Sequence, residues 1–330
     1  MLHSICHVKK QETTNGWAKP KEVQQMGLLP DPKAEPSMRA CYVGGYPDDK
    51  GHLHYLQHAG AEHIIAFAPT RSGKGVGLVL PTLLGGWRES VVVHDTQDEL
   101  YALTAGYRQK IGNRVLKFNP SSTPDDPQCC HFNPLDEVRI GTEFEIADVQ
   151  NIAAVLADPY DEGFFSDNLS KQFSFSLFAS VILHVLYTGT NKTLQGVAAF
   201  LMDMPTLDAA FESMLSGGKV HPFITQVAKE ITCRSDGDKT VILYRSIHLL
   251  KPYVDPVVSE WTAYSDFRIT DLQDSEKPIT LFLVRSTYKD TPWGSEEKEC
   301  AQPLIRLLMR LLASRLTAPD RLSEKKNGVT

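Results

Sequence analysis

The sequence has little of what marks a secreted protein or a strongly basic nucleic-acid-binding protein. It contains six cysteines in 330 residues. None of them forms a CxxC pair, so the sequence indicates a reducing compartment and not a disulfide framework. The formal net charge is −6, so no global positive field draws the chain to DNA or to anionic lipid. Any contact with nucleic acid is therefore expected to be local.

A long uninterrupted hydrophobic run is also missing. The longest apolar stretch, residues 173–187, is broken by serines and a histidine and is shorter than the roughly 20 residues that a bilayer crossing needs. The first ten residues, MLHSICHVKK, contain no apolar signal core. We therefore expect residues 173–187 to form a buried helix, and we predict a cytoplasmic chain.

The most informative feature that is present is the glycine-rich stretch APTRSGKGVG, residues 68–77. It follows a short apolar run, residues 64–68, that predicts a buried strand. It precedes an apolar pattern that predicts a helix, shortened or kinked at Pro81. Strand, loop and helix in this order are the context of a phosphate-binding loop.

The residue types in this stretch suit the phosphates of a nucleotide. Glycines let backbone N–H groups converge on phosphate oxygens at the positive end of a helix. Lys74 follows Gly73 directly, as in the pattern GxxxxGK(S/T), so its ammonium can reach the β- and γ-phosphates. The predicted nucleotide-binding residues are Pro69, Thr70, Arg71, Ser72, Gly73, Lys74, Gly75 and Val76.

This loop departs from the usual pattern in its magnesium ligand. Gly75 stands where a Ser or Thr is usual, so Thr70, Ser72 or water has to supply that oxygen. Arg71 could meet a γ-phosphate of its own or a neighbouring site, or could simply be solvated. The alternative for the whole stretch is a glycine-rich turn that only joins a strand to a helix.

The remaining pattern predicts an α/β protein with a helical insertion. The prolines and glycines of residues 30–50, with the turn Asp48-Asp49-Lys50-Gly51, predict a loop followed by a hairpin. Residues 90–94 and 114–118 predict strands separated by a helix at 101–111, which indicates a parallel sheet. A further strand is expected at 279–284, followed by an amphipathic helix over residues 303–316. The predicted domains are an N-terminal extension (1–40), the first part of a nucleotide-binding domain (41–133), an inserted all-α domain (134–265) and a continued, truncated nucleotide-binding domain (266–330).

A series of different short motifs follows along almost the whole chain. They are GWA (16–18), LVLPTLL (78–84), SVVVHDTQDE (90–99), LTAGYR (103–108), VLKFNP (115–120), FNPL (132–135), DPVV (255–258), SDFRITDL (265–272) and PLIRLL (303–308). This order resembles the TraG-like coupling proteins of conjugation and type IV secretion. That family commonly has a glycine after the phosphate-binding lysine, which accounts for Gly75.

The resemblance implies a RecA-like, ASCE-type P-loop NTPase with a mostly parallel sheet and an inserted all-α domain. It implies a motor that binds ATP and Mg²⁺, assembles as a homo-oligomeric ring and recruits relaxase-bound DNA to a secretion channel. Its partners would be relaxase and relaxosome proteins, DNA and components of the channel. The family works at the cytoplasmic face of the bacterial inner membrane.

One family motif is altered here. The family pattern Asp-x-Lys-Gly-Glu becomes Asp95-Thr96-Gln97-Asp98-Glu99, which keeps the outer acids. We predict catalytic roles for Lys74, Asp95 and Glu99, with a helix cap as the alternative for Asp95. Because a lysine is lost and the carboxylate of Asp98 is gained, anion binding beside the phosphate site should weaken.

A P-loop ATPase also needs an acidic pair after a second buried strand, to hold magnesium and polarise water. Neither residues 91–93 nor residues 281–284 are followed by Asp-Glu. We therefore expect a partial coupling protein, without the family's membrane helices, that hydrolyses little ATP alone. The alternative is a catalytically inactive, truncated module that binds relaxosome or secretion-channel proteins. A small-molecule P-loop kinase is disfavoured because it leaves the helical insertion unexplained.

Other groups of polar residues have simpler interpretations. No metal site is predicted at the histidines of residues 52–63 or at Cys129, Cys130 and His131, because no second group with ligand spacing completes either one. Three arginines lie opposite the leucines of the 303–316 helix, and they could line a DNA path or a ring interface, or simply face water. They are Arg306, Arg310 and Arg315.

Overall fold

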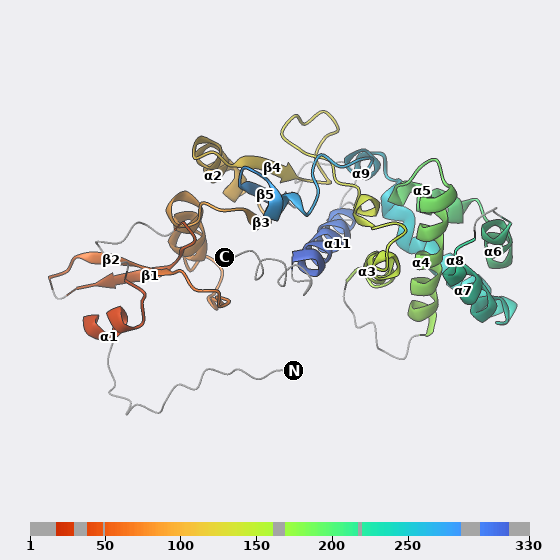
Figure 1. The fold of residues 1–330 in the computed structure, drawn as a ribbon, viewed down its shortest axis with the longest axis horizontal. Helices are drawn as coiled ribbons and strands as arrows, with labels where there is room; N and C mark the ends of the chain where they lie inside the picture. The colour runs from red at the N-terminus through yellow and green to blue at the C-terminus, as the bar shows by residue number, and fades with distance from the viewer. Residues whose placement is uncertain are drawn as a thin grey trace, which may run out of the picture. The chain divides into compact units, whose positions relative to one another are not determined.

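The structure is a computed structural model that describes residues 18–29, 38–48, 50–160, 169–216, 220–284 and 298–316. Figure 1 shows the labelled helices and strands. The chain divides into two compact units, Met1–Glu89 and Ser90–Thr330. The glycine-rich loop lies in the first unit, and the parallel sheet and the helical block lie in the second.

The first unit is built on a β-hairpin. Strand β1 (Cys41–Pro47) pairs antiparallel with β2 (Leu53–His58), and the short helix α1 (Pro20–Gln25) precedes them. Asp48 shapes the turn, because one of its carboxylate oxygens accepts the backbone N–H groups of Lys50 at 2.9 Å and His52 at 2.8 Å. The predicted hairpin is thereby confirmed, including its turn.

The helix after the glycine-rich loop is irregular and is tied to the hairpin. It contains two π-helical segments, η1 (Gly75–Val79) and η2 (Thr82–Gly86), on either side of Pro81. The hydroxyl of Thr82 donates to the Leu78 carbonyl at 2.7 Å and accepts the N–H of Tyr42 from β1 at 3.0 Å. The predicted irregularity at Pro81 is thus confirmed, and Thr82 links the helix to the sheet edge.

The strand predicted over residues 64–68 is wrong. These residues form no strand, and their large side chains are exposed, with Ile65 at 74% and Phe67 at 92%. A strand persists only when neighbouring backbone groups accept and donate its hydrogen bonds. Within the described part of this unit, β1 and β2 pair only with each other. The apolar run is therefore present without the pairing that would bury it.

The second unit contains the predicted parallel sheet. Its strands β3 (Val91–Asp95), β4 (Arg114–Phe118) and β5 (Ile279–Val284) lie in the order β3-β5-β4, and both pairings are parallel. Every residue of the central strand β5 is buried, as its continuous apolar sequence ITLFLV predicts. The helix α2 (Glu99–Lys110) connects β3 to β4. The predicted α/β fold with a parallel sheet is confirmed.

A buried arginine joins these elements. Arg108 of α2 is fully buried and donates to the hydroxyl of Thr280 on β5 at 2.9 Å and to the side-chain oxygen of Asn113 at 2.6 Å. Thr280 in turn donates to Asn113 at 2.8 Å. Burial lowers the pKa of the Arg108 guanidinium. The three polar side chains satisfy one another in a region that water does not reach.

A block of helices separates β4 from β5 in the chain, as the inserted all-α region of the predicted fold requires. Its elements are η3 (Pro134–Glu137), α3 (Glu145–Ala157), α4 (Leu169–Thr188), α5 (Leu194–Met202), α6 (Leu207–Leu215), α7 (Pro222–Thr232), α8 (Asp236–Leu250), η4 (Lys251–Val254), α9 (Pro256–Trp261) and α10 (Asp271–Asp274). By length and composition α4 could cross a membrane, but 61% of its most apolar 18-residue stretch is buried inside the protein. It packs against α3, α5, α7 and α8, which confirms the predicted buried helix.

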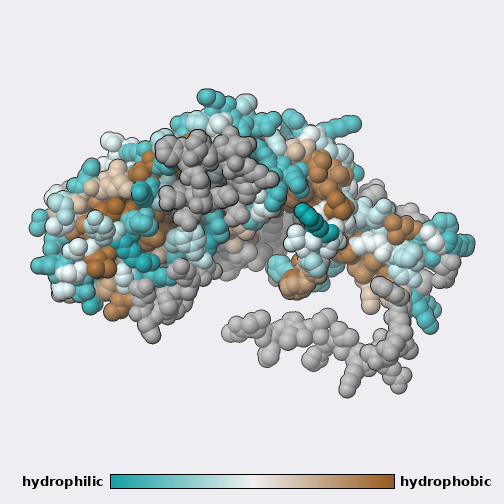
Figure 2. Space-filling view, turned by 180° about the vertical axis from the view of Figure 1, so that it is seen from behind, coloured by the Kyte–Doolittle hydropathy of each residue, from teal (hydrophilic) through white to brown (hydrophobic). Residues whose placement is uncertain are grey.

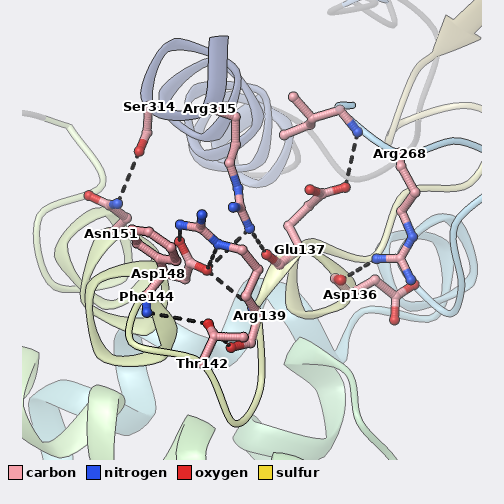
Figure 3. Close-up of polar contacts among 11 residues, drawn as sticks. Asp136, Glu137, Arg139, Thr142, Phe144, Asp148, Asn151, Arg268, Ser314 and Arg315 are labelled. Carbon is pink, nitrogen blue, oxygen red and sulfur yellow. Dashed lines mark hydrogen bonds and ion pairs between the residues drawn. The ribbon is translucent and has the colours of Figure 1, made fainter. Parts of the chain in front are cut away.

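The last helix, α11 (Lys298–Leu316), packs on α3 and is fixed to it by charged side chains (Figure 3). Asp148 of α3 accepts two hydrogen bonds from the Arg139 side chain, each at 2.8 Å, and pairs with Arg315 at 3.2 Å. Arg306 donates to the Asp158 carbonyl at 2.6 Å. Two of the three arginines considered for DNA contact therefore hold the protein together, and Arg310 is exposed.

Candidate functional site

The backbone of the glycine-rich loop is shaped for an anion. Arg71 and Gly73 have positive φ angles of 63° and 86°, whereas Ser72 is not among the residues with positive φ and Lys74 has a φ of −51°. Such an alternation of backbone hand turns successive N–H groups toward one side and is the geometry of a concave nest, a backbone shape able to hold an anion. Arg71 adopts this conformation at a cost, because it is not a glycine.

Lys74 lies inside the loop that precedes it. Its ammonium donates to the carbonyls of Ala68 at 2.7 Å and Pro69 at 2.8 Å, with a longer contact of 3.4 Å to the Ser72 hydroxyl. These contacts hold the charge against the glycine-rich loop. If a phosphate binds there, the Lys74 ammonium would donate to charged phosphate oxygens in place of some of these neutral acceptors. Hydrogen bonds to charged acceptors are stronger.

The glycines that follow Lys74 leave open space at the start of the helix. A Cβ atom added to Gly75 or Gly77 would meet no other atom within 4 Å. The space beside both glycines is therefore open, and backbone can approach a ligand closely there. Gly75 supplies no hydroxyl for magnesium, so the oxygens of Thr70 and Ser72 remain the side-chain candidates in the loop.

The loop forms one wall of a pocket within the first unit. The pocket has a volume of about 470 Å³ and lies between the β1–β2 hairpin and the glycine-rich loop. Gly73, Lys74 and Gly77 line it on the loop side, and Leu53 and Tyr55 line it on the hairpin side. Ligand pockets commonly have volumes of about 300–1,000 Å³, so this one could hold a small molecule.

The acidic residues predicted to be catalytic lie in the second unit, after β3. Asp95 is buried, and one of its carboxylate oxygens accepts the N–H of Tyr101 at 2.8 Å, while the other accepts that of Gln97 at 3.4 Å. Tyr101 lies in the first turn of α2, where N–H groups have no partner within the helix. Asp95 thus acts as a cap of α2. Glu99, at the first position of α2, is exposed.

Asp98 has its own partner in the second unit. Its carboxylate accepts a hydrogen bond from the Lys117 ammonium of β4 at 2.7 Å, and the ammonium also lies 4.7 Å from the centre of the Tyr101 ring. Burial alone would lower the pKa of Lys117, but the hydrogen bond and charge of Asp98 outweigh it, so that pKa is raised. The added carboxylate of Asp98 is therefore paired with Lys117, and the expected weakening of anion binding stays a prediction.

The histidines of the hairpin form a smaller polar group. One carboxylate oxygen of Asp48 lies 3.2 Å from Nδ1 of His52 and 3.2 Å from Nε2 of His54. Over the described ranges of the chain, no three His, Cys, Asp or Glu side chains are arranged to hold a metal ion. These contacts therefore support the turn.

Sequence reasoning missed two functional features. Lys117 lies within the motif VLKFNP but was given no role, although a lysine within an apolar strand calls for a charged partner. Leu53 and Tyr55 were assigned only to a hairpin. Their alternation on one face, with Tyr55 opposite Gly45 of β1, was the available signal that the hairpin could line a pocket.

The chain was compared with known proteins. The family model for type IV secretory system conjugative DNA transfer matches residues 9–323. A conjugal transfer protein TraG of Escherichia coli is 39% identical over 324 residues, which covers 91% of this chain and 49% of that protein. Protein VirD4 of Rhizobium radiobacter is 28% identical over 322 residues, covering 93% of this chain and 42% of that protein. This chain thus spans about half the length of these relatives.

A solved structure agrees at the level of the fold. The unbound monoclinic form of the bacterial conjugative coupling protein TrwBdeltaN70 has a TM-score of 0.50 and 16% sequence identity, covering 76% of this chain and 50% of that one. Identity at this level shows a likeness of the α/β fold alone. With the family model matching most of the sequence, the chain belongs to the TraG-like family of type IV secretory system conjugative DNA transfer proteins.

Proposed function

We propose that residues 69–76 bind the triphosphate of ATP together with Mg²⁺. The observation that carries this proposal is the position of Lys74, which lines an open pocket and whose ammonium is held by the carbonyls of a loop with alternating backbone hand. The backbone N–H groups would hold phosphate oxygens, and Lys74 would neutralise their charge. Catalytic roles for Lys74, Asp95 and Glu99 stay predictions.

In this proposal the chain is the ATP-binding portion of a coupling protein. Membership of the family supports a role in linking relaxase-bound DNA to a type IV secretion channel at the cytoplasmic face of the inner membrane. A homo-oligomeric ring, relaxosome proteins and channel components belong to the same proposal. In the alternative, the helical block binds relaxosome or channel proteins and the loop has no ligand.

Titration with ATP and Mg²⁺, followed by calorimetry, tests the proposal. The chain should bind ATP, and Lys74→Ala should weaken binding by about tenfold or more, since one charge-assisted contact is worth about 1.5–3 kcal/mol. Lys50→Ala is the matched control, because Lys50 is an exposed lysine in the hairpin turn of the same unit. Its affinity for ATP should equal that of the unmodified chain.

Two results would contradict this function. If the unmodified chain binds no ATP, the interaction-module alternative is favoured. If Lys74→Ala and Lys50→Ala bind ATP equally well, the nucleotide does not use the glycine-rich loop. Binding of relaxosome proteins by a Lys74→Ala chain would then support the alternative, in which the helical block carries the binding activity.

A further inference from the structure

The pocket of the first unit is bordered by exposed apolar side chains. Tyr55 is 58% exposed and Leu53 57%, and across the pocket Phe67 is 92% exposed. On the face drawn in Figure 2, hydrophobic residues reach the surface in patches separated by hydrophilic ones. Exposed apolar side chains gathered around one pocket mark a ligand or interaction site.

The register of the hairpin explains why these side chains are free. Tyr55 pairs with Gly45 across the sheet, so the residue directly opposite it carries no side chain. Leu53 lies two residues before Tyr55 on the same face, and a Cβ on Gly45 would approach Leu53 to 2.9 Å. Gly45 thus leaves space beside Leu53 on this face of the hairpin.

The ring of Tyr55 is also held in place. Tyr42 of β1 meets it edge-on, with ring centres 5.9 Å apart and planes at 89°, and Tyr42 is itself fixed through Thr82 to the helix of the glycine-rich loop. An aromatic ring whose orientation is set before binding loses little freedom when a flat ligand stacks on it.

We propose that this pocket holds the nucleoside part of the nucleotide, with the base stacked on Tyr55 and flanked by Leu53 and Phe67. This inference rests on the proposed binding of phosphates by the glycine-rich loop, since Gly73 and Lys74 form the other end of the same pocket. Every base has a π-face, and the side chains on the hairpin side carry few polar groups to read base edges. The pocket therefore takes nucleoside triphosphates without strong choice between bases, adenine and guanine included.

Calorimetry with two probes separates the ends of the pocket. Mg²⁺-ATP carries phosphates and a base, and inorganic tripolyphosphate carries phosphates alone. Loss of a stacking ring should weaken ATP binding by about tenfold, because base stacking is worth about 1–3 kcal/mol. Tyr55→Ala should show this loss with ATP and none with tripolyphosphate, while Tyr55→Phe should keep the affinity of the unmodified chain. Lys74→Ala should weaken both probes.

Two further variants guard against a folding artefact. Phe67→Ala removes a side chain that is almost fully exposed, so its fold should be intact, and its ATP affinity should fall several-fold by loss of apolar contact. Tyr244→Ala removes an equally exposed tyrosine from the second unit and should change neither affinity. Unchanged tripolyphosphate affinity reports that the loop of each variant is folded.

The outcomes distinguish this inference from the function on which it rests. If Tyr55→Ala and Phe67→Ala bind ATP as the unmodified chain does while Lys74→Ala does not, the base lies elsewhere and only this inference fails. The same holds if the unmodified chain binds tripolyphosphate as tightly as ATP, in which case the apolar face serves a protein segment. If the unmodified chain binds neither probe, the proposed function fails first.

Discussion

The carboxylate of Asp98 accepts a hydrogen bond from the Lys117 ammonium at 2.7 Å and so joins the start of α2 to β4. Asp98 has a φ of 60°, a left-handed conformation that an aspartate adopts more readily than most residues. It stands where the family pattern has glycine, which adopts that conformation freely. The charge that replaces the glycine is therefore balanced inside this unit.

Removing either partner of this pair should cost stability. Lys117 is buried and Asp98 is partly exposed, with 6% and 36% of their side chains exposed. Lys117→Met should lower the free energy of unfolding by about 2 kcal/mol, between the ~0–1 of a surface pair and the ~3–5 of a buried one. Urea unfolding followed by circular dichroism measures this change.

A double-mutant cycle isolates the interaction. Asp98→Gly leaves the lysine without its carboxylate but relaxes the backbone, and the double variant Asp98→Gly with Lys117→Met removes both groups. We expect a coupling energy of about 1 kcal/mol or more between the two changes. Additive effects would mean that the contact contributes nothing measurable.

Asp95 should behave as a helix cap. Asp95→Ala leaves the N–H of Tyr101 without its acceptor, which should cost about 1–2 kcal/mol of unfolding free energy. Asp95→Asn keeps an acceptor oxygen and should recover most of that loss. Glu99→Gln, an exposed change in the same turn, is the control and should have little effect on stability.

The same variants separate a structural role of Asp95 from a catalytic one. If Asp95→Asn is stable but loses magnesium-dependent ATP binding, the carboxylate charge has a role in the nucleotide site. Equal destabilisation by Ala and Asn would contradict the capping role, because the acceptor oxygen would then be irrelevant.

Asp148 should be the most sensitive carboxylate of the network in Figure 3. It is almost fully buried and neutralises Arg139 and Arg315, so Asp148→Asn leaves two guanidinium groups with a weaker acceptor. We expect a loss of about 3 kcal/mol in unfolding free energy. Glu143→Gln is the control, because Glu143 is exposed near the start of α3 and should change stability by less than about 0.5 kcal/mol. Similar unfolding midpoints for both variants would show that the network is dispensable.

The thiol of Cys129 should react slowly with alkylating reagents. Burial raises its pKa to about 11, and its hydrogen bond to Asp126 at 3.3 Å acts in the same direction. Because only the thiolate reacts, alkylation at about pH 8 should be much slower than at exposed Cys233 and should rise steeply toward pH 11. Mass spectrometry after timed exposure to iodoacetamide measures both sites. Equal rates at neutral pH would mean that Cys129 is not buried in solution.

Several elements could be predicted because their signals are local. The runs at β3, β4 and β5 are apolar and rich in β-branched residues, and each is bounded by polar or turn residues, so strands were expected within one residue of where they lie. The leucines of α11 repeat with helical spacing and are buried as predicted. The limits proposed for the inserted domain, residues 134 and 265, stay a prediction.

Sequence reasoning failed where a strand or a charge depends on a partner that is distant in the chain. Residues 64–68 have the composition of a buried strand, but strand formation requires a second strand to accept its hydrogen bonds, which composition does not report. The sequence showed the carboxylate of Asp98 but not its partner. Lys117 lies nineteen residues later in the chain and meets Asp98 only because β4 folds beside α2.

The sequence by itself determined the family, the glycine-rich character of the loop and the order of strands and helices in the sheet-bearing unit, because these depend on residue types at short spacing. Only the tertiary structure decided that Asp95 caps α2, that Lys117 balances Asp98, and that the hairpin and the loop enclose a pocket. Those relationships depend on contacts between segments far apart in sequence, and the geometry of such contacts is set by packing and not by local pattern.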